Sequence, residues 1–171
     1  MLNVENLSTS YQVRKLTVQD ANKAFALVQS NPTYFSYCPP QATRHSILED
    51  MKVVPANKTL DDKYYVGFFK DNDLIAILDL VTSYPDDKSA WMGFFMVDAK
   101  YQGKGIGSSI MSDVLSAVEN SGISRIELAY AKGNVQSEQF LLKNGFVKDG
   151  REIPVPGYTV VVMEQNLAGM V

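Results

Sequence analysis

A glycine-rich turn in the second half of the chain, Gln102-Gly103-Lys104-Gly105-Ile106-Gly107, restricts the possible folds more than any other segment. The run before it, from Ser89 to Val97, is aromatic and apolar, which is typical of a strand. The run after it places apolar residues on one helical face: Ile110, Met111, Val114, Leu115 and Val118. Backbone N–H groups at a helix start lack partners and carry partial positive charge, and glycines let an anion approach them. The turn therefore predicts a site for a ligand that contains phosphate.

Two common phosphate-binding motifs do not fit this turn. A phosphate loop of the Walker type requires Gly-Lys followed by serine or threonine, and here Lys104 is followed by Gly105. A dinucleotide-binding fingerprint requires a third glycine where this chain has Ser108, and it belongs to the first strand–helix unit of a parallel sheet. Here the turn follows three strand-like segments, so a nucleotide-dependent kinase or dehydrogenase is disfavoured.

The remaining pattern predicts one α/β domain that spans residues 1–171. Tyr11–Val18 alternates like a strand, and the helix after it is expected to stop at Asn31-Pro32, because the residue before a proline avoids the helical region. A second, shorter helix is expected from Gln41 to Met51. Six further segments are expected to be strands: Lys63–Phe69, Leu74–Val81, Ser89–Val97, Ile123–Tyr130, Phe146–Lys148 and Tyr158–Met163. Two more helices are expected, one closed by Ser121-Gly122 and one from Asn134 to Asn144. The order is strand, two helices, three strands, helix, strand, helix and two strands.

The glycine-rich turn resembles the pyrophosphate signature of the GNAT superfamily of N-acetyltransferases. That signature is a glutamine or arginine, a glycine three residues later and a glycine or alanine two residues after that, and the turn matches it completely. Three further segments agree in the right order. The family strand beside the cofactor resembles Phe95-Met96-Val97. The helix next to the cofactor begins in the family with a segment similar to Asn134-Val135-Gln136-Ser137, and it ends with one similar to Lys143-Asn144-Gly145-Phe146. Together with the order of the elements, the resemblance covers most of the chain.

The resemblance implies a mixed, mainly antiparallel central sheet with flanking helices, and acetyl-coenzyme A as co-substrate. In the family the cofactor lies between two neighbouring parallel strands that diverge, here Trp91–Val97 and Arg125–Tyr130. An N–H near the end of the first strand would steady the oxyanion while an amine attacks the thioester directly. Lys104 as a solvated lysine and Asn134 as a helix N-cap are the plainer alternatives. The implied cofactor-binding residues are Phe95, Met96, Val97, Gln102, Gly103, Lys104, Gly105, Ile106, Gly107, Ser108, Asn134 and Ser137.

Two positions depart from the family pattern. Leu141 stands where many members carry a tyrosine that protonates the leaving thiolate, and Met92 stands where many carry a glutamate that acts as base. We expect substitutes in the same cleft: Asp79 as base, because burial raises the pKa of a carboxylate, and Tyr84 or Tyr130 as acid. Ordered water, or an amine that arrives neutral, would make these groups unnecessary. The plainer alternatives are a backbone hydrogen bond for the aspartate and a core or rim position for the tyrosines.

The predicted function is therefore transfer of an acetyl group from acetyl-coenzyme A to a primary amine. A small molecule, a peptide amino terminus and a lysine side chain are all open as the acceptor. The changes at Met92 and Leu141 also allow an alternative, a sensor that binds acyl-coenzyme A with little transfer.

Charge, cysteine and histidine content and hydropathy indicate which other partners to expect. A formal net charge of −3, without a long run of like charge, lacks the electrostatic pattern of a nucleic-acid-binding protein. The single Cys38 and the single His45 predict neither an internal disulfide nor a metal site. No apolar run approaches the roughly 20 residues of a membrane span, so a cytoplasmic protein is expected. Tyr158–Met163 is apolar on both faces, and a homodimer through this region is expected.

Overall fold

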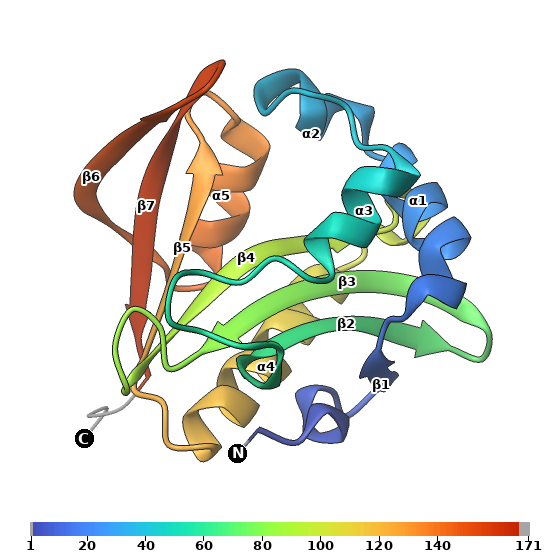
Figure 1. Ribbon diagram of the computed structural model, residues 1–171, viewed down its shortest axis with the longest axis horizontal. Helices are drawn as coiled ribbons and strands as arrows, with labels where there is room; N and C mark the ends of the chain where they lie inside the picture. The colour runs from blue at the N-terminus through green and yellow to red at the C-terminus, as the bar shows by residue number, and fades with distance from the viewer. Residues whose placement is uncertain (1, 168–171) are drawn as a thin grey trace.

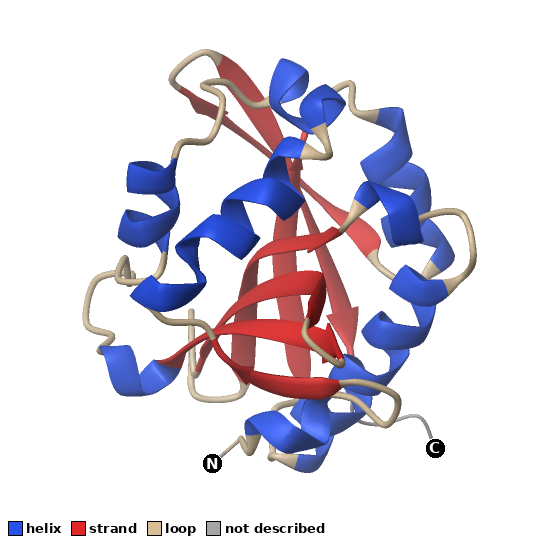
Figure 2. Ribbon diagram, turned by 90° about the vertical axis from the view of Figure 1, so that its right-hand side faces the viewer, coloured by secondary structure: helices blue, strands red, loops and turns tan. Residues whose placement is uncertain are grey.

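The computed structural model describes residues 2–167, which form a mixed, seven-stranded sheet with helices on both faces, as predicted (Figures 1 and 2). The strands are β1 (Gln12–Lys15), β2 (Lys63–Lys70), β3 (Asp73–Thr82), β4 (Ser89–Val97), β5 (Arg125–Ala131), β6 (Val147–Val155) and β7 (Tyr158–Asn166). The α-helices are α1 (Ala21–Gln29), α2 (Pro32–Tyr37), α3 (Arg44–Asp50), α4 (Ile106–Asn120) and α5 (Val135–Lys143). Four short 3-10 helices are η1 (Val4–Leu7), η2 (Val18–Asp20), η3 (Leu60–Asp62) and η4 (Ala99–Tyr101).

The sheet opens between β4 and β5. Its strand order is β1-β2-β3-β4-β5-β7-β6, and β4–β5 is the one parallel pair among the described strands. These two strands pair only from Ser89 with Arg125 to Met92 with Leu128. Beyond that point they separate, and Figure 1 shows β4 and β5 running apart. The predicted divergence of these two segments is therefore present.

A β-bulge lies at the point where β4 leaves β5. In the pairing of β3 with β4, Asp79 is opposite Phe94 while Leu80 is opposite Met92, so Gly93 is the extra residue. A Cβ atom at Gly93 would lie 3.3 Å from Oδ2 of Asp79, which is closer than most side-chain contacts. Glycine therefore lets the bulged strand approach this carboxylate.

Alternate strand residues face two separate cores, because successive side chains of a strand point to opposite faces. The larger core lies under α4 and α5, and the smaller one lies under α1 and α3. Buried members of the larger core include Leu78, Leu80, Ile110, Val114, Ile126 and Leu128. Buried members of the smaller core include Leu27, Ile47, Tyr65, Ile77 and Met96. The sheet thus separates an α4–α5 face from an α1–α3 face.

The first part of the chain differs from the prediction, because three α-helices rather than two precede β2. Asn31-Pro32 does end α1, but Pro32 also begins α2. Proline is well suited to the first position of a helix, where its missing N–H would have no intrahelical partner. The expected second helix corresponds to α3, which begins after a capping box between Thr43 and Ser46.

The last two strands also differ from the prediction. β6 continues through Pro154, which an edge strand tolerates because one side of it makes no ladder hydrogen bonds. β7 lies inside the sheet, paired with β5 on one side and β6 on the other. The apolar character of Tyr158–Met163 thus belongs to an interior strand, so a second copy cannot pair with the edges of β7.

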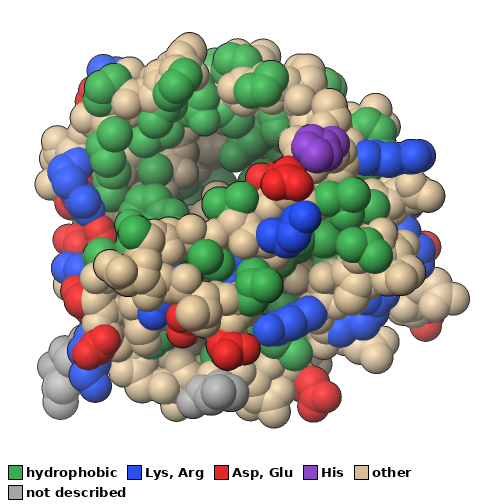
Figure 3. All heavy atoms as spheres, in the orientation of Figure 1, with side chains coloured by type: hydrophobic (Ala, Val, Ile, Leu, Met, Phe, Trp, Pro, Cys, Tyr) green, Lys and Arg blue, Asp and Glu red, His purple; other side chains and the backbone are tan. Residues whose placement is uncertain are grey.

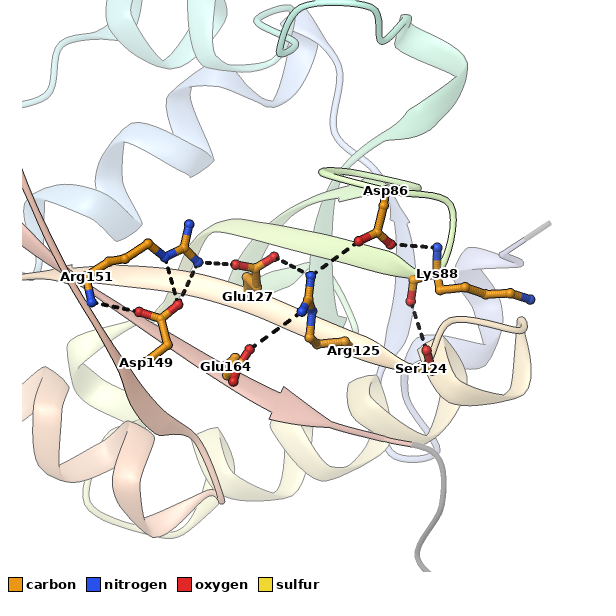
Figure 4. Close-up of polar contacts among 8 residues, drawn as sticks. All are labelled: Asp86, Lys88, Ser124, Arg125, Glu127, Asp149, Arg151 and Glu164. Atoms are coloured by element: carbon orange, nitrogen blue, oxygen red, sulfur yellow. Dashed lines mark hydrogen bonds and ion pairs between the residues drawn. The ribbon is translucent and has the colours of Figure 1, made fainter.

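A network of charged side chains fixes the end of the sheet where β4 and β5 remain paired (Figure 4). Glu127 on β5 has a side chain only 3% exposed, and it accepts hydrogen bonds from Arg125 and from Arg151 on β6. Arg125 also lies 3.3 Å from Asp86 in the β3–β4 turn and 3.9 Å from Glu164 on β7. A buried carboxylate with two guanidinium partners holds three strands and a turn in one register.

Candidate active site

A cavity of about 540 Å³ lies beside the end of β4, between the start of α4, α5 and the α1–α2 junction. In the orientation of Figure 3, the surface is hollowed between the part that carries α5 and the part that carries α2 and α3. Hydrophobic side chains border much of this hollow. The cavity therefore lies beside the part of β4 that no longer pairs with β5.

Most of the predicted cofactor residues line this cavity. The lining includes Phe95, Met96, Val97, Gln102, Gly103, Gly105, Gly107, Ser108, Asn134 and Ser137. Two predicted residues are not among the lining residues: Lys104 is exposed, and Ile106 packs against the larger core. The structure thus brings the glycine-rich turn, the end of β4 and the start of α5 together.

The start of α4 presents backbone amides to open space. Gly105 caps the helix with a φ of 79°, and Gly103 has a φ of 77°. No atom lies within 4 Å of the position that a Cβ would take at either glycine. Gly107 is different, because a Cβ there would lie 3.1 Å from the Phe140 ring. Amides at the first turn of a helix, with open space above them, suit a pyrophosphate group.

Gln102 holds the turn in place through its side chain. Its Nε2 atom donates hydrogen bonds to Oδ1 of Asn31 at 2.6 Å and to the carbonyl oxygen of Val97 at 2.7 Å. Asn31 also donates from Nδ2 to the same Val97 oxygen at 3.1 Å. Gln102 lines the cavity, but its amide nitrogen is already used to connect the turn with β4 and the α1–α2 junction.

The opposite wall of the cavity is the start of α5. Asn134 is 5% exposed, and its Oδ1 atom accepts a hydrogen bond from the Ser137 N–H at 3.1 Å. This is an N-cap contact, and it uses only the carbonyl oxygen of the side chain. Farther along α5, the Phe140 ring stacks on Phe95 with 6.0 Å between ring centres. The side of β4 that faces α5 is therefore packed by an aromatic pair.

Asp79 lies on the α1–α3 face beside the bulge. Its Oδ2 atom accepts a hydrogen bond from Nζ of Lys63 at 3.1 Å, and Lys63 also donates to the carbonyl oxygen of Val53 at 2.6 Å. The Oδ1 atom is buried and has no hydrogen-bond partner among the described residues. Burial raises the pKa of Asp79, although Lys63 acts in the opposite direction. The partner is a buried lysine rather than the loop backbone considered from the sequence.

None of the three predicted catalytic residues, Asp79, Tyr84 and Tyr130, is among the residues that line the cavity. Tyr84 lies in the turn before β4, where its N–H donates to the Ser89 carbonyl oxygen at 3.0 Å. Ser89 and Val97 are the two ends of β4, roughly 25 Å apart at the usual rise of a strand. The Tyr130 hydroxyl donates to Oε2 of Glu138 on α5 at 2.7 Å, and burial and this carboxylate raise its pKa. The structure does not bring these tyrosines to Asp79.

The two family positions that are apolar here point into the larger core. Met92 is 4% exposed and Leu141 is 8% exposed, and both belong to the cluster under α4 and α5. A tyrosine that the sequence analysis passed over lies in the cavity wall instead. Tyr34 on α2 packs edge to face against Phe94, with 5.8 Å between the ring centres. Its sequence signal was weak, because the segment after Asn31-Pro32 was expected to be a helix end.

Cys38 and His45 have no visible part in the chemistry. The Cys38 thiol donates to the carbonyl oxygen of Tyr34 at 3.4 Å, and burial raises the pKa of the thiol, which disfavours the nucleophilic thiolate. His45 is exposed on α3. Among residues 2–167 no three histidine, cysteine, aspartate or glutamate side chains gather into a metal site. No helix within that range is long and apolar enough to cross a membrane.

This arrangement is that of an acyl-coenzyme A-binding fold: the sheet opens between β4 and β5, β4 carries a bulge, and open space lies at the start of α4. Comparison with known proteins agrees. The model of the acetyltransferase (GNAT) family matches residues 25–146. The ribosomal-protein-serine acetyltransferase of Escherichia coli strain K12 is 27% identical over 150 residues, which cover 84% of this chain and 83% of that protein. The spermine/spermidine N(1)-acetyltransferase of Bacillus subtilis strain 168 is 29% identical over 109 residues, 59% of this chain and 71% of that protein.

Solved structures share the fold. An acetyltransferase from Thermus thermophilus superimposes with a TM-score of 0.72 at 18% identity, covering 91% of this chain and 96% of that one. The PaiA N-acetyltransferase from Thermoplasma acidophilum, in complex with coenzyme A, superimposes with a TM-score of 0.68 at 18% identity. This match covers 92% of this chain and 99% of that one. The chain belongs to the acetyltransferase (GNAT) family. It is an N-acetyltransferase that takes its acetyl group from acetyl-coenzyme A and passes it to an amine. The comparisons give no support to the alternative of a sensor without transfer.

Proposed function

We propose that acetyl-coenzyme A occupies the cavity with its pyrophosphate at the start of α4 and its thioester beside the bulge at Gly93. The observation that carries this placement is the geometry of the two ends of the cavity. Open space lies above the glycine-rich turn, and the lining of the cavity reaches Phe95 on β4, beyond the last residue of β4 that pairs with β5. The pantetheine arm would then run between β4 and β5, past Asn134, as the family resemblance implies.

The amine would reach the thioester from the α1–α3 face, on which Asp79 lies. Its nitrogen bonds to the carbonyl carbon, and the electron pair of the carbon–sulfur bond passes to sulfur. A backbone N–H of β4 near Met96 or Val97 steadies the oxyanion. Asp79 takes the proton that the nitrogen loses, directly or through one water. A carboxylate with a raised pKa and an unpartnered oxygen beside the bulge supports this role.

The acceptor we propose is a cationic primary amine, because Asp79 and the nearby Asp50 place two carboxylates around Lys63 on the α1–α3 face. Two relatives suggest the compounds to try first. One is named for a ribosomal-protein serine and the other for spermine and spermidine. A panel of spermidine, spermine and short peptides with amino-terminal serine, followed by release of free thiol, would identify the acceptor class.

Gly105→Val tests the placement of the cofactor. The added side chain would fill the open space above the amides, so we expect the affinity for coenzyme A to fall at least about 100-fold, as measured by calorimetric titration. Gly122→Val is the matched control at the other end of α4. Gly122 also has a positive φ, 101°, with no atom near its Cβ position, so it carries the same backbone strain away from the cavity. Equal affinities in the two folded variants would contradict the placement.

Two broader expectations remain part of the proposal: a cytoplasmic location and a homodimer. Because β7 is paired on both sides, a strand-to-strand contact in this half of the sheet would use the outer edge of β6. Val147 and Ile153 on this strand are exposed. Light scattering at micromolar concentration would measure the oligomeric state, and a monomer there would end the dimer proposal.

A further inference from the structure

The reaction leaves negative charge on the sulfur of coenzyme A, and the usual tyrosine that meets it is absent. Leu141 occupies its position and is buried in the larger core. The hydroxyl of Tyr130 is bonded to Glu138, and Tyr84 lies at the far end of β4. Tyr34 is the one tyrosine among the described residues that line the cavity. It also comes from an element that the sequence did not predict.

The position of Tyr34 is fixed close to the bulge. Pro32 begins α2, and Asn31 just before it is hydrogen-bonded to the Val97 carbonyl oxygen and to Gln102. The Tyr34 ring packs edge to face on Phe94, at an angle of 89° between the rings. Phe94 follows the bulge directly and precedes the last residue of β4 by roughly 10 Å of strand. Tyr34 therefore lies toward the thioester end of the cavity, away from the pyrophosphate end.

The surroundings of the Tyr34 hydroxyl keep it protonated. Burial is the main cause of its strongly raised pKa, and the groups around it act in the same direction. These groups are Cys38 from the end of α2, whose side chain also shares a hydrogen bond with the hydroxyl, Tyr158 from β7 and Asp50 from α3. A phenol that stays neutral across the working pH range is a constant hydrogen-bond donor. It is a poor source of protons, since an efficient general acid has a pKa near the working pH.

We propose that Tyr34 donates a hydrogen bond from its hydroxyl to the sulfur of coenzyme A as the carbon–sulfur bond breaks. This inference rests on the proposed placement of the cofactor. The hydroxyl keeps its proton throughout. The electron pair of the broken bond stays on sulfur, the amine proton leaves through Asp79 to solvent, and the thiolate later takes a proton from water. A hydrogen bond to a charged acceptor is stronger than one to a neutral acceptor, so the bond strengthens as charge develops on sulfur.

The test uses the thiol of bound coenzyme A and requires no acceptor. A donor to sulfur stabilises the thiolate, so the thiol pKa in the complex with the unaltered protein should be about one unit or more lower than in the complex with Tyr34→Phe. The ultraviolet absorbance of the thiolate, followed through a pH titration of each complex, gives this value. Phenylalanine keeps the ring contact with Phe94. Tyr11→Phe, a change on the α4–α5 face outside the cavity lining, should match the unaltered protein.

The outcomes separate this inference from the placement of the cofactor. Loss of coenzyme A binding in Gly105→Val but not in Tyr34→Phe, with the thiol pKa raised in the latter, supports both. Normal binding with the same thiol pKa in both proteins overturns the role of Tyr34 and leaves the placement standing. A raised thiol pKa in Tyr130→Phe, with none in Tyr34→Phe, assigns the donor to Tyr130 instead. Once an acceptor is known, Tyr34→Phe should lower kcat about 10- to 100-fold with an unchanged Kd for coenzyme A.

Discussion

The two sides of the proposed active site differ in what they offer a ligand. The cofactor side, made by the end of β4, the glycine-rich turn and the start of α5, offers mainly backbone amides with open space above them. The proposed acceptor side, made by α1–α3 and the adjoining parts of β2 and β3, offers side chains: Tyr34 in the cavity wall, and the ion pair of Lys63 with Asp79 beyond it. Backbone recognition requires glycines at fixed spacing and therefore leaves a pattern in the sequence. Side-chain recognition gathers residues from separate elements and leaves none.

Helix length sharpens the same contrast. α4 has 15 residues and shows several turns of apolar periodicity, so its position follows from the sequence. α2 has six residues, too few for periodicity to distinguish it from a loop, and α3 has seven, fewer than the Gln41–Met51 span that the sequence predicted. The acceptor side thus depends on short helices held by tertiary contacts, and three substitutions can test this division.

The largest expected effect comes from Asp79→Asn. We expect kcat/KM to fall at least about 100-fold while the affinity for coenzyme A stays unchanged, because the substitution removes the proposed base and leaves the proposed pyrophosphate site intact. In the unaltered protein kcat/KM should rise with pH as Asp79 loses its proton, at an apparent pKa above 3.8, and the variant should lack this rise. The free energy of unfolding should also fall by about 3 kcal/mol, because Lys63 is left buried without its carboxylate.

Asp61→Asn provides the comparison for that experiment, since Asp61 is an exposed carboxylate in η3. It should keep the pH profile of the unaltered protein. A pH-dependent rise that persists in Asp79→Asn would instead show that the acceptor amine loses its proton in solution.

A smaller effect is expected on the cofactor side from Asn134→Asp. The carboxylate still caps α5, so the free energy of unfolding should change little, but the amide N–H donors are lost and a negative charge is added. We expect the Kd for coenzyme A to rise about tenfold, which is about 1.4 kcal/mol. Asn134→Ala should lose the cap as well, at a cost of about 1 kcal/mol in stability. An unchanged Kd in both variants would reduce Asn134 to a cap alone.

The smallest effect is expected from an ion pair between β1 and the start of α1, which lies outside the cavity. Arg14 on β1 donates to both carboxylate oxygens of Asp20 before α1, at 2.8 and 2.9 Å, and lowers the pKa of Asp20 to about 2. A lowered carboxyl pKa gives stability that is present above about pH 4 and is lost as the pH falls toward 2. Because Arg14 is half-exposed, we expect Asp20→Asn to cost about 1 kcal/mol at pH 7 and almost nothing near pH 2. Denaturant titration at both pH values would measure this, and an equal cost at both would contradict it.

The sequence predicted the sheet and most of the residues that the structure gathers around the cavity, because these depend on local patterns. The middle strands lie close to their predicted bounds, and Asn134 begins α5 as expected. It could not predict that Lys63 would be the partner of Asp79, since that contact depends on the register between β2 and β3. It also missed α2, because a proline that ends one helix can begin the next.

The opening in the sheet also makes ligand binding part of the thermodynamics of folding. Beyond Met92 on β4 and Leu128 on β5, the backbone groups on the facing edges do not pair with each other, although each strand is paired on its other side. Backbone donors and acceptors need partners, so a ligand in the opening, as proposed for acetyl-coenzyme A, would complete the sheet. A ligand that binds only the folded chain adds about 2.7 kcal/mol to its stability at 100 times its Kd. With acetyl-coenzyme A bound there, its supply would influence both the rate of this enzyme and the fraction of the chain that stays folded.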